Sequence, residues 1–592
     1  MLNIFLLMND DLVTIFTEMA ELLAMKEVPF KPRAFEKAAL AIGELRESVA
    51  EIYKKGGISS LEEIPGVGRG IAERIEEYIK TGHIKDYEAL KKKMPVRVEE
   101  LTRIEGVGPK MIKTLYEKLG IRTRKQLEVA ARAGKIAKLP RFGKKSEEKI
   151  LKSIAFLKQS GGRMPIGEAL PLAREIKALL EKVEGVERVE IAGSLRRWQE
   201  TIGDIDVLAV SAKPKNVMEA FVKMPGVKAV HMRGETKSSV RLKQNIDADV
   251  RVVPRESFGA ALQYFTGNKA HNVALRKIAI EKGYKLNEYG LFWADKKATP
   301  FNKRRRLLIA GRTEEEIYKA LGLQYIEPEM RFDEGEIERA RKNELPSIID
   351  YHDIRGDLQV QTNWTDGAHS IEEMAKAAAE LGRAYIAITD HTRGLAMTGG
   401  SDEKKLVKQI KEIERINRKI QDTRHKIQIL SGAEVNIKKD GSLDIDDETL
   451  AQLDVVGAAI HSHFKLSKKE QTDRLIRAIE NPHVDIIFHP SSRIVARREP
   501  IEMDIEAVLK AAAEAGTAME IDAHPWRLDL SYEHIRLALK HEVKLVIDTD
   551  AHSKDELGFM EYGIAQARRA GVRKKDVLNT LPVEKFLKAF KK

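Results

Sequence analysis

The spacing of apolar residues changes twice along the chain. Between Leu12 and Leu22 apolar residues recur every three or four positions, which predicts a helix that Asn9 or Asp10 caps. The same spacing continues to about residue 158. The first part of the chain is therefore expected to be almost entirely helical.

From Gly161 to about Tyr325, short apolar runs between turns replace this spacing and indicate a mixed α/β region. Residues 326 to 352 carry many charges and are punctuated by Pro328 and Pro346, and they are interpreted as a linker. The strands expected before it are Val189–Ala192, Ile205–Val210, Val227–Met232, Ser238–Leu242 and Asp249–Val253.

After Arg355, short apolar strands alternate regularly with helices. Repeated alternation of this kind predicts a parallel sheet or a barrel. The expected strands are Ala384–Ile388, Ile427–Leu430, Val455–Ile460, Val484–Phe488, Ala518–Ile521 and Lys544–Ile547.

A glycine-containing turn occurs twice in the helical part, from Ile64 to Gly70 and from Ile104 to Lys110, with a degenerate third copy from Leu139 to Lys145. Glycine permits a tight turn and leaves amide N–H groups exposed at the start of the next helix, where a phosphate is favoured. An ordinary pair of helices joined by glycines is the alternative. Two good copies followed by basic residues favour binding of a nucleic-acid backbone.

Asp204 and Asp206 stand at the start of the apolar run that ends at Val210. Residues two apart in a strand point to the same face, so these carboxylates can converge, although an isolated pair is usually a solvated strand end. A third carboxylate would complete a site for Mg²⁺, and two such ions can serve an in-line phosphoryl displacement. Spacing alone does not choose between Asp247 and Asp249 as the third ligand.

The run from Gly193 to Arg197 precedes this pair of aspartates. Its glycine and Ser194 offer backbone and hydroxyl donors to a phosphate, and Arg196 and Arg197 offer charge.

Metal-ligating side chains follow the strands predicted after Arg355. Groups at the C-terminal ends of barrel strands are typical of a metal-dependent enzyme, and histidine with carboxylates suits Zn²⁺ or Mn²⁺. The residues are Asp390, His391, Glu434, His461, His489, Asp548, Asp550 and His552.

Composition narrows these interpretations. A chain of 592 residues is too long for one hydrophobic core, and its net charge of +12 fits a polyanionic partner. The chain has no cysteine, which excludes disulfides and thiolate chemistry and is compatible with a cytoplasmic protein. The apolar start, Met1 to Met8, is too short for a signal peptide, and no later stretch is expected to cross a membrane.

Two known families resemble this chain. Residues 9 to 325 resemble a family X DNA polymerase, the group of DNA polymerase beta, and residues 353 to 592 resemble the PHP (polymerase and histidinol phosphatase) domain. This pairing is similar to the PolX proteins of bacteria and archaea. The motifs that carry the resemblance are Gly193 to Arg197, Gly203 to Leu208, Asp249 to Pro254, Tyr264 to Gly267, Asn272, Arg276 and Asn287 to Gly290.

The resemblance implies a multidomain fold with an all-α helix-hairpin-helix region, a polymerase beta-like α/β palm and thumb, and a distorted (β/α)7 barrel. The expected domains are 9–90, an N-terminal DNA-binding domain; 91–158, a fingers-like domain with the second helix-hairpin-helix; 159–255, the palm; 256–325, a nucleotide-selecting thumb; 326–352, the linker; and 353–592, the PHP domain.

In the polymerase half, the family pattern selects Asp249 over Asp247. Asp204 and Asp206 would bind two Mg²⁺ or Mn²⁺ ions, and Asp249 would position or deprotonate the primer 3′-hydroxyl. The incoming nucleotide would contact Gly193, Ser194, Arg197, Tyr264, Phe265, Gly267, Asn272 and Arg276. DNA would contact Gly66, Gly68, Gly106, Gly108 and Lys110, and the turns could hold a monovalent cation.

In the PHP half, three metal ions are implied. Glu434, His461 and His489 would bind one, and Asp366, His391 and His552 another. The remaining site would keep Glu434 and Asp550. The family's opening His-x-His is replaced here by Gln359 and Gln361, and an amide oxygen is a poor ligand for a borderline metal. Arg493 is a candidate phosphate contact or an ordinary surface arginine.

A second departure concerns lyase activity. Members of the family that remove an abasic sugar use a lysine on the helix after the first hairpin, and this chain has Arg74 there. Arginine stays protonated and cannot act as that amine.

The resemblance thus implies a monomeric DNA-directed DNA polymerase that fills short gaps in DNA repair, including base excision repair. It would use gapped or primed DNA and deoxynucleoside triphosphates. The PHP domain would be a 3′–5′ exonuclease weakened by its glutamines, and an abasic-site endonuclease activity is also implied. The alternatives are a polymerase with a mainly structural PHP domain, and a DNA-binding scaffold or small-substrate nucleotidyltransferase joined to a phosphoesterase.

Overall fold

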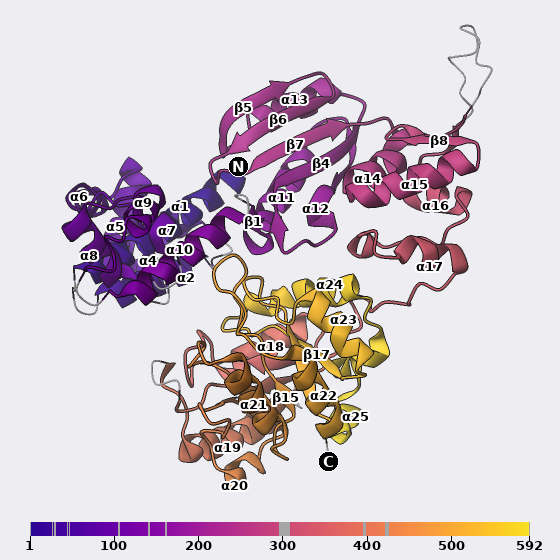
Figure 1. The fold of residues 1–592 in the computed structure, drawn as a ribbon. Helices are drawn as coiled ribbons and strands as arrows, with labels where there is room; N and C mark the ends of the chain where they lie inside the picture. Colours follow the sequence, from indigo (N-terminus) through magenta and orange to yellow (C-terminus); the bar gives the residue numbers. More distant parts are fainter. Residues whose placement is uncertain are drawn as a thin grey trace. The chain divides into compact units, whose positions relative to one another are not determined.

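The computed structural model describes residues 2–26, 28, 31–43, 45, 48–64, 66–102, 104, 107–139, 142–159, 163–294, 308–394, 398–420 and 426–590. It forms two compact units. Unit 1 is Met1–Gly162 with Ala496–Arg498, and unit 2 is Arg163–Val495 with Glu499–Lys592. Figure 1 shows both units, which are described separately below.

Unit 1 is helical, as its apolar spacing predicts. Phe16 and Ile75 belong to one hydrophobic core and Leu101 and Ile112 to a second. The helices are α1 (Leu2–Met25), α2 (Lys31–Gly43), α3 (Val49–Gly56), α4 (Ile58–Glu62), α5 (Arg69–Thr81), α6 (Lys85–Lys93), α7 (Val98–Thr102), α8 (Pro109–Leu119), α9 (Arg124–Arg132) and α10 (Lys144–Gln159).

The turn that recurs in the sequence recurs in the backbone. Before α5, the amide of Val67 donates to the Ile64 carbonyl at 2.9 Å, and before α8 the amide of Val107 donates to the Ile104 carbonyl at 2.9 Å. The third turn, before α10, repeats this bond from Phe142 to Leu139, at 3.0 Å. The degenerate copy therefore shares this hydrogen bond with the other two.

Unit 2 contains a five-stranded sheet, here called the palm sheet, with strand order β2-β4-β7-β6-β5. Helices α11 (Ile166–Leu180) and α13 (Pro214–Val222) pack on it (Figure 1). The strands are β2 (Val186–Ile191), β4 (Asp204–Ser211), β5 (Val227–Arg233), β6 (Lys237–Leu242) and β7 (Asp247–Val252). All five predicted strands are present, with ends that shift by up to three residues.

Smaller elements surround the palm sheet. A two-stranded ribbon, β1 (Met164–Pro165) and β3 (Thr201–Ile202), flanks the short helix α12 (Gly193–Arg196). After the palm sheet come η1 (Arg255–Ser257), α14 (Phe258–Thr266), α15 (Lys269–Glu281), β8 (Tyr284–Asn287), β9 (Gly290–Trp293), β10 (Leu308–Ala310) and α16 (Glu314–Ala320).

The segment interpreted as a linker is packed rather than open. It holds η2 (Pro328–Met330) and α17 (Glu336–Lys342). Arg331 and Glu336 are buried, and Arg331 Nη1 lies 2.6 Å from Glu314 Oε1. Several of its charges are buried and paired with residues outside the segment: Arg331 with Glu314, Glu336 with His271 and Glu329 with Arg568.

The third part of unit 2 is a parallel barrel of seven strands in sequence order, as predicted. A bridge between Val360 and Ala551 brings the first strand beside the chain that follows the last, so the barrel is nearly closed. The first strand is absent from the predicted set because its sequence is interrupted by polar residues. The strands are β11 (Gly356–Val360), β12 (Tyr385–Ile388), β13 (Gln428–Asn436), β14 (Val455–Ala459), β15 (Ile486–Ile487), β16 (Ala518–Asp522) and β17 (Leu545–Asp548).

Helices separate and follow these strands. They are α18 (Ile371–Glu380), α19 (Glu403–Ile420), α20 (Asp447–Leu450), α21 (Lys468–Ile479), α22 (Ile505–Ala515), α23 (Tyr532–Lys540), η4 (Glu556–Phe559), α24 (Met560–Ala570), η5 (Lys574–Asp576), η6 (Leu578–Thr580) and α25 (Val583–Phe590). Among the described residues, no helix combines the length and the apolar character that a membrane crossing needs.

Close packing inside the barrel predicts that one added methyl group lowers the stability of the fold. Gly457 on β14 lies opposite Glu434, and a Cβ there would lie 1.8 Å from the Phe488 ring. Gly457→Ala is expected to destabilise the barrel by about 1–3 kcal/mol, because the ring cannot move within a packed interior. Thermal unfolding followed by circular dichroism measures this. The control is Gly558→Ala, where a Cβ meets nothing within 4 Å, and equal midpoints for the two variants would contradict the expectation.

Candidate active sites

Carboxylates gather where the parallel strands β4 and β7 lie side by side. The register places Asp206 opposite Asp249 and Asp204 opposite Asp247. Burial, then the charges of Asp204 and Asp249, raise the pKa of Asp206 to about 7. A carboxyl group that is half protonated at neutral pH exchanges its proton readily for a cation.

The two candidates for the third ligand have different partners. Both oxygens of Asp247 face Arg241, with Nε 2.6 Å from Oδ1 and Nη2 2.9 Å from Oδ2, and His231 Nε2 is 3.1 Å from Oδ1. Asp249 forms an ion pair with Lys237, whose Nζ is 3.0 Å from Oδ2. Asp249 also acts on Asp206, so the geometry favours it over Asp247.

The glycine-serine turn touches this cluster directly. Gly193 has a φ of 65°, and a Cβ there would lie 2.3 Å from Asp206 Oδ2. Ser194 Oγ is buried and has no hydrogen-bond partner within the described part of the chain. A buried hydroxyl group without a partner can donate a hydrogen bond to a phosphate oxygen.

The two arginines after Ser194 are not equivalent. Arg196 forms a two-pronged ion pair with Glu314, at 3.0 and 2.6 Å, so it binds α16 rather than a ligand. Arg197 donates from Nη1 to the Thr266 carbonyl. Burial, and then the charge of Arg331, lower the pKa of Arg197 to about 10. An anion would relieve both effects, which supports Arg197 as the triphosphate contact.

The remaining predicted nucleotide contacts lie on α14, α15 and the turn between them. The rings of Tyr264 and Phe265 meet edge to face at 5.1 Å. Asn272 is nearly buried, and its Nδ2 donates to the Tyr264 carbonyl at 2.7 Å. Gly267 lies beside Arg197, with 3.3 Å from its Cβ position to Nη1. Arg276 is half-buried on α15.

In unit 1, Gly66 has a φ of 78°, and Gly68 and Gly108 are the N-caps of α5 and α8. Lys110 is exposed in the first turn of α8. Gly106 lies outside the described residues.

Arg74 is engaged within unit 1. Its Nη2 pairs with Asp86, its Nη1 donates to the Gly70 carbonyl, and its guanidinium lies 5.8 Å from the centre of the Phe35 ring. These contacts hold the Arg74 guanidinium in place within unit 1.

Glu434, on β13, is the centre of the barrel cluster. It is fully buried. His461 and His489 approach its Oε1 with Nε2 at 2.9 and 2.8 Å, and His391 Nδ1 is 3.1 Å from Oε2. Burial alone would raise the pKa of Glu434, but the charges of His391 and His461 hold it well below its usual range.

Two groups of these residues have ligand atoms close enough to share a cation: His391 with Glu434 and His461, and Asp366 with His391 and His552. His391 Nε2 is 3.6 Å and His552 Nε2 is 3.8 Å from Asp366 Oδ2. Imidazoles with carboxylates fit Zn²⁺ or Mn²⁺, so the side chains present suit two ions.

The glutamines do not suit a third ion of the same kind. Gln361 Nε2 donates to Glu434 Oε2 at 2.8 Å, so an N–H group faces the carboxylate where a metal ligand is needed. Gln359 is fully buried, and neither amide atom has a partner among the described residues. Asp550 faces Arg527, with Nε 3.3 Å from Oδ2. Arg527 follows the strand β16, and no sequence pattern singled it out.

Two other predicted strand-end residues, Asp390 and Asp548, and one residue near them, Asn436, form hydrogen bonds within the barrel. Asp390 accepts hydrogen bonds from Thr362, Thr365 and Gln409, and Asp548 Oδ1 accepts from the Leu358 amide at 2.8 Å. Asn436, which sequence analysis missed, lies with Oδ1 2.7 Å from His461 Nδ1 and orients that ring.

Arg493 is largely buried rather than a surface arginine, with 13% of its side chain exposed. Its guanidinium pairs with Glu200, which precedes β3, at 2.8 and 3.1 Å. Glu200 is a residue that sequence analysis did not identify.

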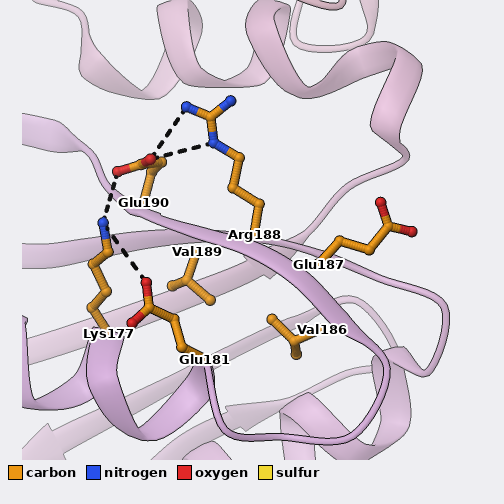
Figure 2. A pocket seen from close by; sticks show the side chains of 7 residues that line it. All are labelled: Lys177, Glu181, Val186, Glu187, Arg188, Val189 and Glu190. Atoms are coloured by element: carbon orange, nitrogen blue, oxygen red, sulfur yellow. Dashed lines mark hydrogen bonds and ion pairs between the residues drawn. The ribbon is translucent and has the colours of Figure 1, made fainter.

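A cavity of about 300 Å³ lies elsewhere, beside the edge strand β2 and α11 (Figure 2). Most of its charged groups already pair with one another: Lys177 Nζ is 3.0 Å from Glu190 Oε2, and Arg188 Nη2 is 3.2 Å from Glu190 Oε1. None of the predicted site residues lines it.

Comparison with protein families matches four segments. Residues 8–84 match a helix-hairpin-helix domain, 98–155 a SAM-like helix-hairpin-helix tandem, 261–332 the DNA polymerase beta thumb and 357–547 the PHP domain. A probable phosphatase of Thermoanaerobacter sp. (strain X514) is 33% identical over 236 residues, 38% of this chain and 90% of its own.

Two DNA polymerases are also similar to this chain, over different shares of its length. DNA polymerase lambda of Rattus norvegicus is 28% identical over 302 residues, 46% of this chain and 49% of its own. The DNA polymerase/3′–5′ exonuclease PolX of Bacillus subtilis (strain 168) is 37% identical over 587 residues, 98% of this chain and 99% of its own. With 37% identity at that coverage, and with helix-hairpin-helix, polymerase beta thumb and PHP segments matched along it, the chain belongs to the PolX group of family X DNA polymerases that carry a PHP domain.

Proposed function

We propose that this chain is a gap-filling DNA-directed DNA polymerase that joins deoxynucleoside triphosphates to primed or gapped DNA, with a 3′–5′ exonuclease in its barrel. The observation that carries the polymerase assignment is the β4–β7 register, which sets Asp206 beside Asp249 with a pKa near 7. Membership in the PolX group argues against a non-polymerase scaffold. We further propose a cytoplasmic, monomeric enzyme of DNA repair.

The roles follow from the geometry of the palm sheet. Asp204, Asp206 and Asp249 would hold Mg²⁺ or Mn²⁺. The bound ions supply charge to the attacking and leaving oxygens. Ser194 Oγ and Arg197 would bind the triphosphate, and Lys237, which pairs with Asp249, would hold that carboxylate beside the primer end.

The barrel cluster supports a second hydrolytic site. Glu434 and its histidines, with Asp366 and His552, would hold Zn²⁺ or Mn²⁺. The bound ions would activate water for phosphodiester cleavage. The alternative, a mainly structural barrel, rests on the hydrogen bond from Gln361 to Glu434. Asn436 and the backbone at His489 and Asp550, with φ of 29° and 51°, favour an active site, because strained residues concentrate at such sites.

Asp249→Asn is expected to lower primer extension on a gapped duplex by about two to three orders of magnitude, because a neutral amide replaces one negatively charged ligand of the cation. Asp247→Asn is the matched control, one alternate position away on the same strand, and should keep activity within about threefold. Single-nucleotide insertion with a labelled primer measures both. Equal losses in the two variants would reject the assignment.

The raised pKa of Asp206 predicts how the metal requirement depends on pH. The ionised form binds the cation, so protons compete below a pH of about 7 and the competition ends above it. The Mg²⁺ concentration for half-maximal extension should rise by up to about tenfold for each pH unit below 7. Titration of extension with Mg²⁺ between acidic and alkaline pH tests this. A requirement that stays constant would show that Asp206 is ionised throughout.

The barrel assignment predicts bound metal as well as activity. The purified chain is expected to hold about two transition-metal ions per chain, because two groups of side chains among the described residues suit them. His461→Ala should lose metal and 3′–5′ degradation of a labelled single strand, and keep extension. Elemental analysis and a degradation assay measure the two outcomes. A metal-free wild-type chain that still fails to degrade DNA after Mn²⁺ is added would favour the structural alternative.

A further inference from the structure

A charged cluster joins the predicted nucleotide-binding loop to the barrel. Glu200 stands three residues after Arg197 and four before Asp204. Its side chain is only 22% exposed, and Arg493 of the barrel is 13% exposed. Two parallel contacts link them, Nη1 to Oε2 at 3.1 Å and Nη2 to Oε1 at 2.8 Å. Such two-pronged pairs fix orientation as well as distance.

Other barrel residues complete this cluster. Gln566 Nε2 donates to Glu200 Oε1 at 2.8 Å, and Arg569 Nη1 is 3.7 Å from the same oxygen. Arg493 Nη2, which donates to Glu200 Oε1, also donates to the Leu528 carbonyl, so the guanidinium is tied to the barrel backbone as well as to Glu200. Burial would raise the pKa of Glu200, but the charges of Arg493 and Arg569 lower it below its usual value. The carboxylate is therefore ionised and paired at neutral pH.

Backbone hydrogen bonds connect Glu200 to the loop that precedes it. The Gln199 amide donates to the Ser194 carbonyl at 3.1 Å, and the Trp198 amide donates to the Leu195 carbonyl at 2.9 Å. The Glu200 carbonyl accepts from the Ile166 amide at 3.0 Å. A shift of Glu200 would thus be transmitted to Ser194 over a few covalent and hydrogen bonds.

Trp198 supplies a second contact with the same surface. Its φ of 51° lies in the left-handed region, which a bulky side chain disfavours. The ring meets Tyr562 of α24 edge to face at 5.5 Å and lies 6.2 Å from Tyr351. The strained loop conformation is therefore supported by aromatic packing from outside the palm sheet.

We infer that Glu200 is a positioning residue for nucleotide incorporation, and that the barrel's Arg493 holds it in place. The barrel thereby contributes to polymerase activity through the loop that bears Ser194 and Arg197, without touching DNA or nucleotide at that site. The inference rests on the proposed assignment of Ser194 and Arg197 to the triphosphate.

Single-nucleotide insertion by the full-length chain on a gapped duplex tests this, with Glu200→Gln, Arg493→Met and the double variant. Each single change is expected to raise the KM for the incoming nucleotide about tenfold and to change kcat by less than about threefold. The double variant should be no worse than the worse single variant, because the first change already removes the interaction. Degradation of a single strand by Glu200→Gln should match wild type.

The matched control is the pair Arg174 and Glu561, which joins α11 to α24 with two contacts of 2.7 Å but lies apart from the loop in sequence. Arg174→Met with Glu561→Gln should leave the KM unchanged. Thermal midpoints of all variants are measured in parallel. Lower midpoints with an unchanged KM in Glu200→Gln would show a purely structural pair and overturn the inference.

Two further outcomes are decisive. A KM that falls in Glu200→Gln would show that Glu200 acts by opposing the positive field around the triphosphate, and the positioning role would be overturned. A wild-type chain that does not extend a primer would overturn the proposed function and this inference together, whereas extension with an unchanged KM in the variant would overturn this inference alone.

Discussion

Repulsion between carboxylates on adjacent parallel strands is the constraint on which the palm sheet depends. Pairing β4 with β7 in parallel brings Asp206 and Asp249 together, and burial makes their charges costly, as the pKa of about 7 for Asp206 shows. Lys237 offsets part of that charge. The barrel resolves the same problem with imidazoles around Glu434 and a guanidinium, Arg527, beside Asp550. Both arrangements gather side chains of the types that metal ions prefer as ligands.

Local pattern was enough to predict the elements that carry the site. The strands, the three turns and the barrel follow from apolar spacing and glycine position, because these features reflect contacts close in sequence. The pattern also brought Asp204, Asp206 and the strand-end histidines into consideration. It could not choose between Asp247 and Asp249, since alternation puts both on one face, and the choice depends on Arg241 and His231 from other strands.

The local sequence pattern could not predict charge pairs between residues that are far apart in the sequence. Residues 326–352 looked like a linker because they are charged, yet Arg331 and Glu329 are buried against Glu314 and Arg568. Arg493 was considered a phosphate contact or a surface arginine, and its partner Glu200 lies 293 positions away. The role of a charged residue depends on which counter-ion the fold places beside it. The contact between the barrel and the loop that holds Glu200 therefore could not be predicted from the local sequence.

The three turns of unit 1 have a further consequence. Each has the same amide-to-carbonyl bond, so three copies of one local feature are carried on a single unit. Weak binding sites that are linked in one chain act multivalently. When one site dissociates, the sites that stay bound hold it at a high local concentration, so that it rebinds before the whole chain dissociates. Residence time on a nucleic-acid backbone is then set by avidity rather than by any single contact.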